Sequence, residues 1–144
     1  MFCLLLHLLC FPPFFPTDVV ANAKGELLMT DKGVKRVDVF SPDGKTLLRS
    51  FPMDEAPTGI LLDGDKAYVT TFGTTGHLQI LSLESGRVEA SIPTGSGACH
   101  PMFGPDKKHI YVCNQFQTTI SEIDPVARKV MRTVKVLREP KSAV

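Results

Sequence analysis

The sequence predicts an all-β protein built from one four-stranded unit that occurs three times. The first observation is the alternation of apolar and polar residues in short segments such as 36–40 (RVDVF), because a period of two is typical of β-strands. The second is turn chemistry, since Gly, Pro, Asn and Asp separate these segments, as in 41–44 (SPDG). The third is spacing, because corresponding residues recur at intervals of 40 to 43 positions, as Leu28, Tyr68 and Tyr111 do. Four short strands in a period of roughly 40–45 residues are typical of a β-propeller, whose units are called blades.

Each blade contains four expected strands joined by tight turns or short polar loops. In the first blade, residues 18–55, we expect strands at 19–21, 26–30, 36–40 and 46–51. In the second, residues 56–97, they fall at 58–62, 66–71, 77–82 and 88–92. In the third, residues 98–137, they fall at 99–103, 109–113, 119–123 and 129–136. The chain offers no segment with helix caps and an apolar face of helical period.

The two ends of the chain differ from the blades. Residues 1–17 are almost wholly apolar and resemble the hydrophobic region of a secretory signal peptide, although no Lys or Arg precedes it. The only small-residue cleavage candidate, 21–23 (ANA), competes with the first expected strand. The alternative is a segment that does not belong to the native protein. Residues 138–144 are expected to begin a fourth blade.

Composition and charge limit the partners that the chain can have. The 144 residues carry 16 Lys and Arg against 15 Asp and Glu, a net charge of +1, so net charge favours no polyanionic partner. Basic residues gather on the last expected strand, 129–136, where lysines protect an exposed sheet edge. No aromatic residues alternate with them, so we expect no nucleic-acid binding. No run of 18 apolar residues exists, so we expect no transmembrane helix.

The third unit carries a family resemblance. Residues 104–114 (GPDKKHIYVCN), followed by 120–124 (ISEID), resemble the core of YVTN-type propeller repeats, found in YncE-like and surface-layer-like proteins. The second unit is a looser copy, with 68–71 (YVTT) and 78–81 (LQIL). The first unit, with 25–31 (GELLMTD) and 36–44 (RVDVFSPDG), is also similar to NHL repeats. Three positions depart from the YVTN pattern, namely Cys113 in place of Thr, Lys107 in place of Gly and Thr71 in place of Asn.

Three blades do not make a closed ring. Propellers close with about 4–8 blades, and closure protects the sheet edges. We therefore expect the chain to be a fragment of a larger ring, of seven blades in the family it resembles. A homodimer of two three-bladed halves is the alternative. In either case missing blades or a second copy are needed for ring closure.

The residues that could carry chemistry are few. The loop 114–117, with Asn114, Gln115 and Phe116, offers adaptable hydrogen-bonding groups at a blade end, and His100 corresponds to a channel-side position in related propellers. We predict these four residues as ligand-binding. Phe72 and Phe103, like Phe116, are expected to pack chiefly between blades.

The four cysteines and the histidines support no cofactor. If the hairpin at 104–109 is regular, Cys99 lies diagonally across from Cys113, where either a disulfide or two buried thiols would fit. Adjacent residues of a regular strand point to opposite faces, so Cys99 and His100 cannot ligate one metal together. The haem-attachment pattern, the phosphate-binding loop and the serine-hydrolase and zinc-protease motifs do not occur. We therefore predict no cofactor, no metal and no catalytic residue.

These observations predict a non-catalytic binding or scaffold module of an exported, extracytoplasmic propeller. Its partner is a protein or a small molecule at the propeller face. The alternative is part of a propeller enzyme, either a lactonase-like hydrolase or a redox-associated propeller. Because propellers host many activities, fold does not decide between them.

Overall fold

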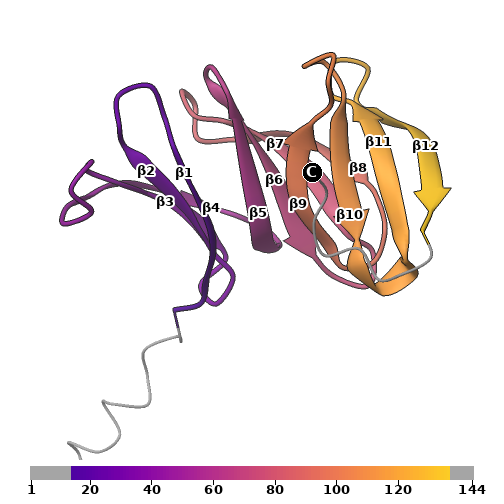
Figure 1. Cartoon of the computed structure of the whole chain (residues 1–144). Coiled ribbons are helices and arrows are strands. Elements are labelled where there is room, and N and C mark those ends of the chain that lie inside the picture. Colours follow the sequence, from indigo (N-terminus) through magenta and orange to yellow (C-terminus); the bar gives the residue numbers. More distant parts are fainter. Residues whose placement is uncertain (1–13, 137–144) are drawn as a thin grey trace, which may run out of the picture.

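Three four-stranded antiparallel sheets make up the structure, a computed structural model that describes residues 14–136 (Figure 1). The first sheet contains β1 (Pro16–Ala21), β2 (Leu27–Asp31), β3 (Arg36–Phe40) and β4 (Leu47–Pro52). The second contains β5 (Ala56–Asp63), β6 (Lys66–Phe72), β7 (His77–Ser82) and β8 (Val88–Pro93). The third contains β9 (Ala98–Phe103), β10 (Ile110–Asn114), β11 (Thr119–Asp124) and β12 (Lys129–Lys135). Strands are neighbours in chain order within every sheet, which is the topology of a propeller blade.

The sheets converge at their first strands. β1 contacts β5, and β5 contacts β9, whereas among the outer strands the contact between β8 and β12 is slight. Figure 1 shows the sheets side by side, with the loops between blades at one end and the first hairpin turns at the other. The molecule is therefore an arc of three propeller blades, as the sequence predicted.

Side chains of Asn and Asp build the hairpin turns. Asn22 Oδ1 accepts hydrogen bonds from the backbone N–H groups of Lys24 (2.9 Å) and Glu26 (3.0 Å). Asp106 and Asp124 act in the same way in the third sheet, where each carboxylate accepts two backbone N–H groups. Such contacts replace ladder hydrogen bonds at the point where the chain reverses.

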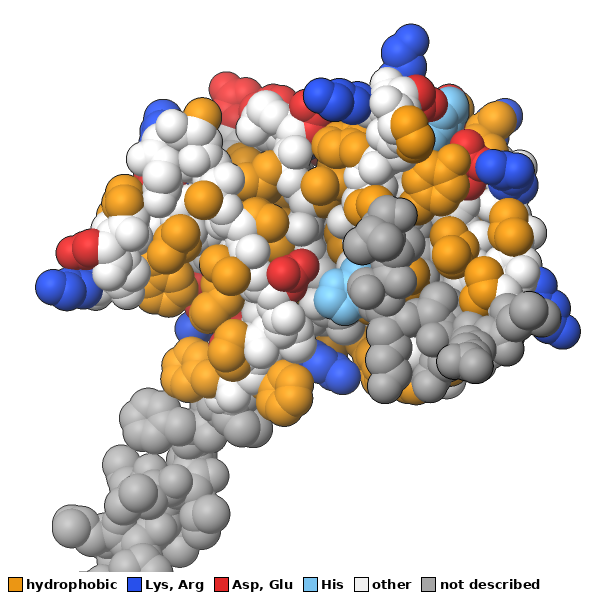
Figure 2. Space-filling view, in the orientation of Figure 1, with side chains coloured by type: hydrophobic (Ala, Val, Ile, Leu, Met, Phe, Trp, Pro, Cys, Tyr) orange, Lys and Arg blue, Asp and Glu red, His pale blue; other side chains and the backbone are white. Residues whose placement is uncertain are grey.

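Two apolar clusters fill the spaces between the sheets. The first lies between sheets one and two, and the second between sheets two and three. Alternation along each strand sends one set of side chains forward and the other backward, so Ile60 and Val69 join the first cluster, whereas Tyr68 and Leu78 join the second. Figure 2 shows hydrophobic side chains between the blades and Lys and Arg mostly at the periphery of that face. Each blade therefore contributes one face to each neighbour.

A hydroxyl on each of the first two inner strands ties neighbouring blades together. Thr17 Oγ1 donates to the carbonyl oxygen of Pro57 (3.2 Å), and Thr58 Oγ1 donates to that of Ala98 (2.8 Å). The two threonines are 41 residues apart in the sequence and occupy the same place in successive blades. The repeat seen in the sequence thus extends to the contacts between blades.

The predicted strands agree with the structure to within three residues, the largest difference being β1, which starts at Pro16 rather than at 19. The loop after β10 contains one feature that the sequence did not predict, the 3-10 turn η2 (Gln115–Gln117). β1 begins at Pro16 and includes Ala21, which pairs with Leu27. Predictions for residues 1–13 and 137–144 lie outside the described residues. Within 14–136 no helix is long and apolar enough to cross a membrane.

The register of β9 corrects one prediction. Cys99 pairs directly with Cys113 and not diagonally, because the pairing shifts between Tyr111 and Cys113. This β-bulge places His100 and Pro101 opposite the single residue Val112. His100 takes φ +47, a left-handed conformation that suits a bulge and that His adopts more readily than most residues.

Candidate functional site

Side chains from all three blades form a row at the end of the molecule where β2, β6 and β10 finish. Lys32 Nζ lies 3.5 Å from the centre of the Phe72 ring, and the rings of Phe72 and Phe116 meet edge to face at 5.5 Å. Phe72 is 37% exposed and Phe116 is 56% exposed. We call Lys32, Phe72 and Phe116 the aromatic row. It presents a cation and two aromatic rings to solvent.

Glycines position the part of the row that belongs to the third blade. A Cβ on Gly97 would lie 2.9 Å from Phe116 Cδ2, and one on Gly95 would lie 2.6 Å from Asn114 Cγ. The backbone N–H groups of Gln115 and Phe116 donate to the carbonyl oxygens of Gly97 and Ser96, both at 3.1 Å. The loop 94–97 therefore packs directly against η2 and fixes the place of Phe116.

Asn114 supports this loop from inside. Its side chain is fully buried, and Nδ2 donates to Thr119 Oγ1 (3.0 Å) and to Ser121 Oγ (2.8 Å). Its Oδ1 has no hydrogen-bond partner. Of the predicted ligand-binding residues, the structure brings Asn114, Gln115 and Phe116 together, with Asn114 beneath the surface and Phe116 on it.

His100 does not join that group. It is exposed on the innermost strand β9, next to Gly59 of β5. The two residues are so close that a Cβ added to Gly59 would lie 3.0 Å from the His100 backbone nitrogen. The sequence did not indicate that Lys32 belongs to the site, and it predicted that Phe72 packs between blades. The signal that could have revealed Lys32 and Phe72 is their shared place in the repeat, since each lies four residues after the corresponding Leu28 or Tyr68.

A carboxylate and an imidazole meet nearby, on the side of the second blade that faces the first. Glu55 Oε2 accepts hydrogen bonds from the Thr71 hydroxyl and from His77 Nδ1, the latter at 2.9 Å. The backbone N–H of His77 donates to Thr71 Oγ1 (3.3 Å). Because Nδ1 donates to the carboxylate, Nε2 is the ring nitrogen that can accept a further proton or ligand.

A pocket opens at the opposite end, at the seam between the second and third blades. Its volume is about 470 Å³, which is in the range of small-molecule sites. Tyr68 and Phe103, whose rings meet edge to face at 6.2 Å, form its apolar wall. The remaining lining residues, which come from three turns, are Asp63, Lys107, Lys108, His109, Asp124, Pro125 and Val126. We call this the seam pocket.

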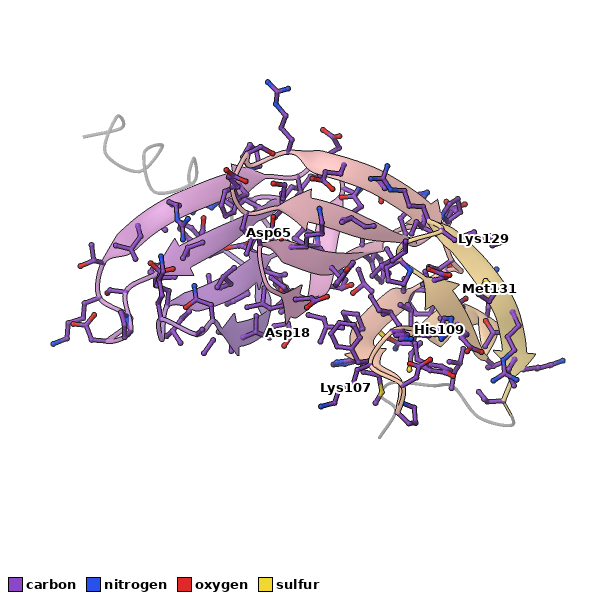
Figure 3. All side chains as sticks on the ribbon, turned by 90° about the horizontal axis from the view of Figure 1, so that it is seen from above. Asp18, Asp65, Lys107, His109, Lys129 and Met131 are labelled. Atoms are coloured by element: carbon purple, nitrogen blue, oxygen red, sulfur yellow. The ribbon has the colours of Figure 1, made fainter. Side chains whose placement is uncertain are left out.

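Tyr68 is the most deeply placed polar residue of the seam pocket. Its side chain is 6% exposed, and its hydroxyl makes no hydrogen bond with any described residue. Burial, followed by the negative charge of Asp63, raises the pKa of Tyr68, so the phenol stays protonated and can donate. Figure 3 shows Lys107 and His109 on one turn of the third sheet, at the pocket's rim.

His109 is paired with Asp106 on that rim. His109 Nδ1 lies 2.5 Å from Asp106 Oδ2. Backbone N–H groups of Lys108 and His109, and then the imidazole, lower the pKa of Asp106 to about 2. The hydrogen bond to Asp106 in turn raises the pKa of His109. Among residues 14–136, no group of three or more His, Cys, Asp or Glu side chains could hold a metal ion.

Comparison with known proteins gives a fold and no family. No family model and no curated protein matches the chain. Solved structures do match, at low identity. Hydrazine synthase of Kuenenia stuttgartiensis matches with TM-score 0.78 and 15% identity over 88% of this chain and 38% of its own.

Two further solved structures give the same result. Virginiamycin B lyase of Staphylococcus aureus matches with TM-score 0.72 and 14% identity over 88% of this chain and 44% of its own. AztD of Citrobacter koseri matches with TM-score 0.68 and 16% identity over 91% of this chain and 37% of its own. All three are β-propeller proteins, and this chain spans about two fifths of their length.

Proposed function

We propose that the chain is the three-bladed part of a YVTN-type β-propeller that serves as a binding module, with the aromatic row as its contact surface. The observation that carries this proposal is the exposure of Phe72 and Phe116 beside Lys32, three side chains from three different blades. Aromatic side chains are enriched in protein interfaces and supply most of their binding energy when a partner covers them. The glycine packing around the row supports the same role, because a pre-organised surface loses little entropy on binding.

The partner that fits this surface best is a protein or an extended peptide. The row runs across the blade ends and does not line the described pockets, whereas small molecules usually occupy cavities. The cation beside the rings favours a segment that carries a carboxylate near an apolar side chain. We therefore propose an acidic, partly apolar peptide segment as the ligand class.

A random peptide library displayed on phage, selected against the immobilised full chain, tests this proposal. We expect enriched peptides with an acidic residue next to an apolar one, and an affinity at least tenfold lower for the Phe72→Ala/Phe116→Ala variant. Val126→Ser is the matched control, because Val126 is 91% exposed and lies at the other end of the molecule. Enriched peptides that bind wild type and both variants equally would refute the role of the row.

One observation favours a second candidate function, part of a propeller enzyme of the lactonase-like or redox-associated kind. The seam pocket combines a buried phenol, an imidazole and two carboxylates, which are groups suited to acid–base chemistry. A melting curve with calcium chloride, and hydrolysis of a simple aromatic lactone, distinguish the two candidates. Stabilisation by calcium that is lost in Asp63→Asn, together with lactone hydrolysis, favours the enzyme. The absence of both favours the binding module.

We also propose that the module works outside the cytoplasm, within a larger ring. The apolar character of residues 1–17 supports export. Because Ala21 belongs to β1, cleavage at 21–23 would remove an inner strand, so we place any processing site before Pro16. The share of the solved structures that the chain spans supports further blades in the complete ring.

A further inference from the structure

The inner hairpin of every blade carries a matched pair of side chains. In the first blade Thr17 Oγ1 lies 2.9 Å from Thr30 Oγ1, and in the second Thr58 Oγ1 lies 3.0 Å from Thr70 Oγ1. In both pairs the inner threonine also reaches the backbone carbonyl oxygen of its partner, at 3.4 and 3.1 Å. In both blades the side-chain oxygen of the threonine on the inner strand therefore lies close to that of the threonine on the next strand.

Cysteines replace both threonines in the third blade. Thr17, Thr58 and Cys99 follow one another at intervals of 41 residues, and Cys113 occupies the place of Thr30 and Thr70. Cys99 Sγ lies 3.6 Å from the carbonyl oxygen of Cys113, which repeats the contact of the inner threonines. Both cysteines are thiols in the structure.

The backbone geometry suits a covalent bond between the two sulfurs. Cys99 and Cys113 are directly opposite in an antiparallel pair. Directly opposite residues have Cα atoms about 4.5–5.5 Å apart, within the range of about 4.4–6.8 Å that disulfides occupy. The β-bulge is what creates this pairing, since a regular hairpin would place His100, not Cys99, opposite Cys113.

We propose that Cys99 and Cys113 form a reversible cross-strand disulfide with glutathione disulfide or a similar small disulfide as oxidant. The Cys99 thiolate, the more exposed of the two, attacks one sulfur of glutathione disulfide and releases one glutathione thiolate. The Cys113 thiolate then attacks the Cys99 sulfur of this mixed disulfide and releases the second. Two protein thiols are oxidised, one glutathione disulfide is reduced to two glutathione thiols, and each released thiolate takes up one proton.

The surroundings of the sulfurs determine how fast this exchange runs. Burial, followed by the neighbouring Cys113, raises the pKa of Cys99 to about 11, and burial raises that of Cys113. Only the thiolate reacts, so the disulfide forms slowly at neutral pH and faster at pH 9. The bond joins β9 to β10 and restrains the innermost strand of the third blade.

Mass spectrometry of the full chain after incubation with glutathione disulfide tests the proposal. Trypsin cuts after Arg87, Lys107, Lys108 and Arg128, so each cysteine lies in its own peptide, 88–107 or 109–128. We expect these peptides as a linked pair before reduction and as separate peptides after it. We also expect an increase in Tm of about 4 °C or more in the oxidised protein, which reduction reverses.

The Cys99→Thr/Cys113→Thr variant is the control, because it restores the pair found in the other two blades. It should fold, form no linked peptides and show no change in Tm with oxidant. Folded wild-type protein that yields only glutathione adducts, or links involving Cys3 or Cys10 in place of the 88–107/109–128 pair, would overturn the proposal.

Discussion

Lys107 shows how a single residue departs from the repeat at a measurable cost. It stands where the YVTN pattern has Gly, and its backbone takes φ +53. An L-residue in this left-handed conformation costs about 1–2 kcal/mol, a cost that glycine avoids. The turn at Lys107 in the third blade is therefore less stable than the same turn with glycine at this position would be.

We predict that Lys107→Gly raises the free energy of unfolding by about 0.5–1 kcal/mol, since glycine removes the strain but gains entropy in the unfolded chain. Urea denaturation followed by circular dichroism measures the change. Lys108→Gly is the control, because Lys108 has no positive φ, and it should be neutral or destabilising. Equal effects of the two substitutions would contradict the assignment of strain to Lys107.

Ionisation of Asp106 and His109 makes part of the stability depend on pH. The pKa of His109 is raised in the folded state, so its contribution is present below pH 6.5 and is lost as the pH rises through the folded value. The pKa of Asp106 is lowered to about 2, so its contribution is present above pH 3.8 and is lost as the pH falls toward 2. We predict that the Tm difference between wild type and His109→Gln is largest between about pH 4 and 6 and shrinks above neutrality. A difference that grows at high pH would contradict this pairing.

At the level of elements, the sequence predicted the strands well because period-two alternation and turn residues are local signals. It predicted the aromatic row only in part. Phe116 lies in a loop whose polar composition was visible, whereas Lys32 comes from a different blade and reaches Phe72 only because the sheets stack. The bulge at His100 was also missed, because a one-residue shift in register leaves no mark in the alternation of apolar and polar residues.

Close packing between loops holds the aromatic row in place. A Cβ on Gly76 would lie 2.3 Å from the carbonyl oxygen of Gly95 and 2.6 Å from Ala98 Cβ. Backbone hydrogen bonds join the same two loops. The Thr94 N–H donates to the Gly76 carbonyl oxygen at 2.9 Å. The loop that follows Phe72 thus packs against loop 94–97, which in turn contacts Phe116.

We predict that Gly76→Ala lowers the free energy of unfolding by about 3 kcal/mol and weakens peptide binding, because backbone atoms must move to admit the methyl group. Thr75→Ala, at the exposed neighbouring position, should change stability by less than about 0.5 kcal/mol. Chemical denaturation of the two variants gives the comparison. Similar small losses in both would show that the loops have room to adjust.

At the level of the whole molecule, the two end blades each have a face without a neighbouring blade among the described residues. The first blade exposes Val19, which is 56% exposed, beside a hollow of about 230 Å³ that Leu27, Met29 and Phe40 line with it. The third blade exposes Met131, which is 50% exposed and lies on the outer strand β12 (Figure 3). The blade faces in the interior of the molecule are apolar because another blade covers them. The open faces of the first and third blades show the same alternation of residues along their strands.

We infer that each of these propeller blades requires a neighbouring blade on both sides. Light scattering of the full chain after size exclusion, with far-ultraviolet circular dichroism on the same peak, tests it most directly. We predict β-rich protein that self-associates, with a dimer mass if two copies close a six-bladed ring, and weaker association in Val19→Glu. A monodisperse, cooperatively folded monomer of 15.8 kDa would contradict the claim, because it would show that three blades are stable with both end faces open.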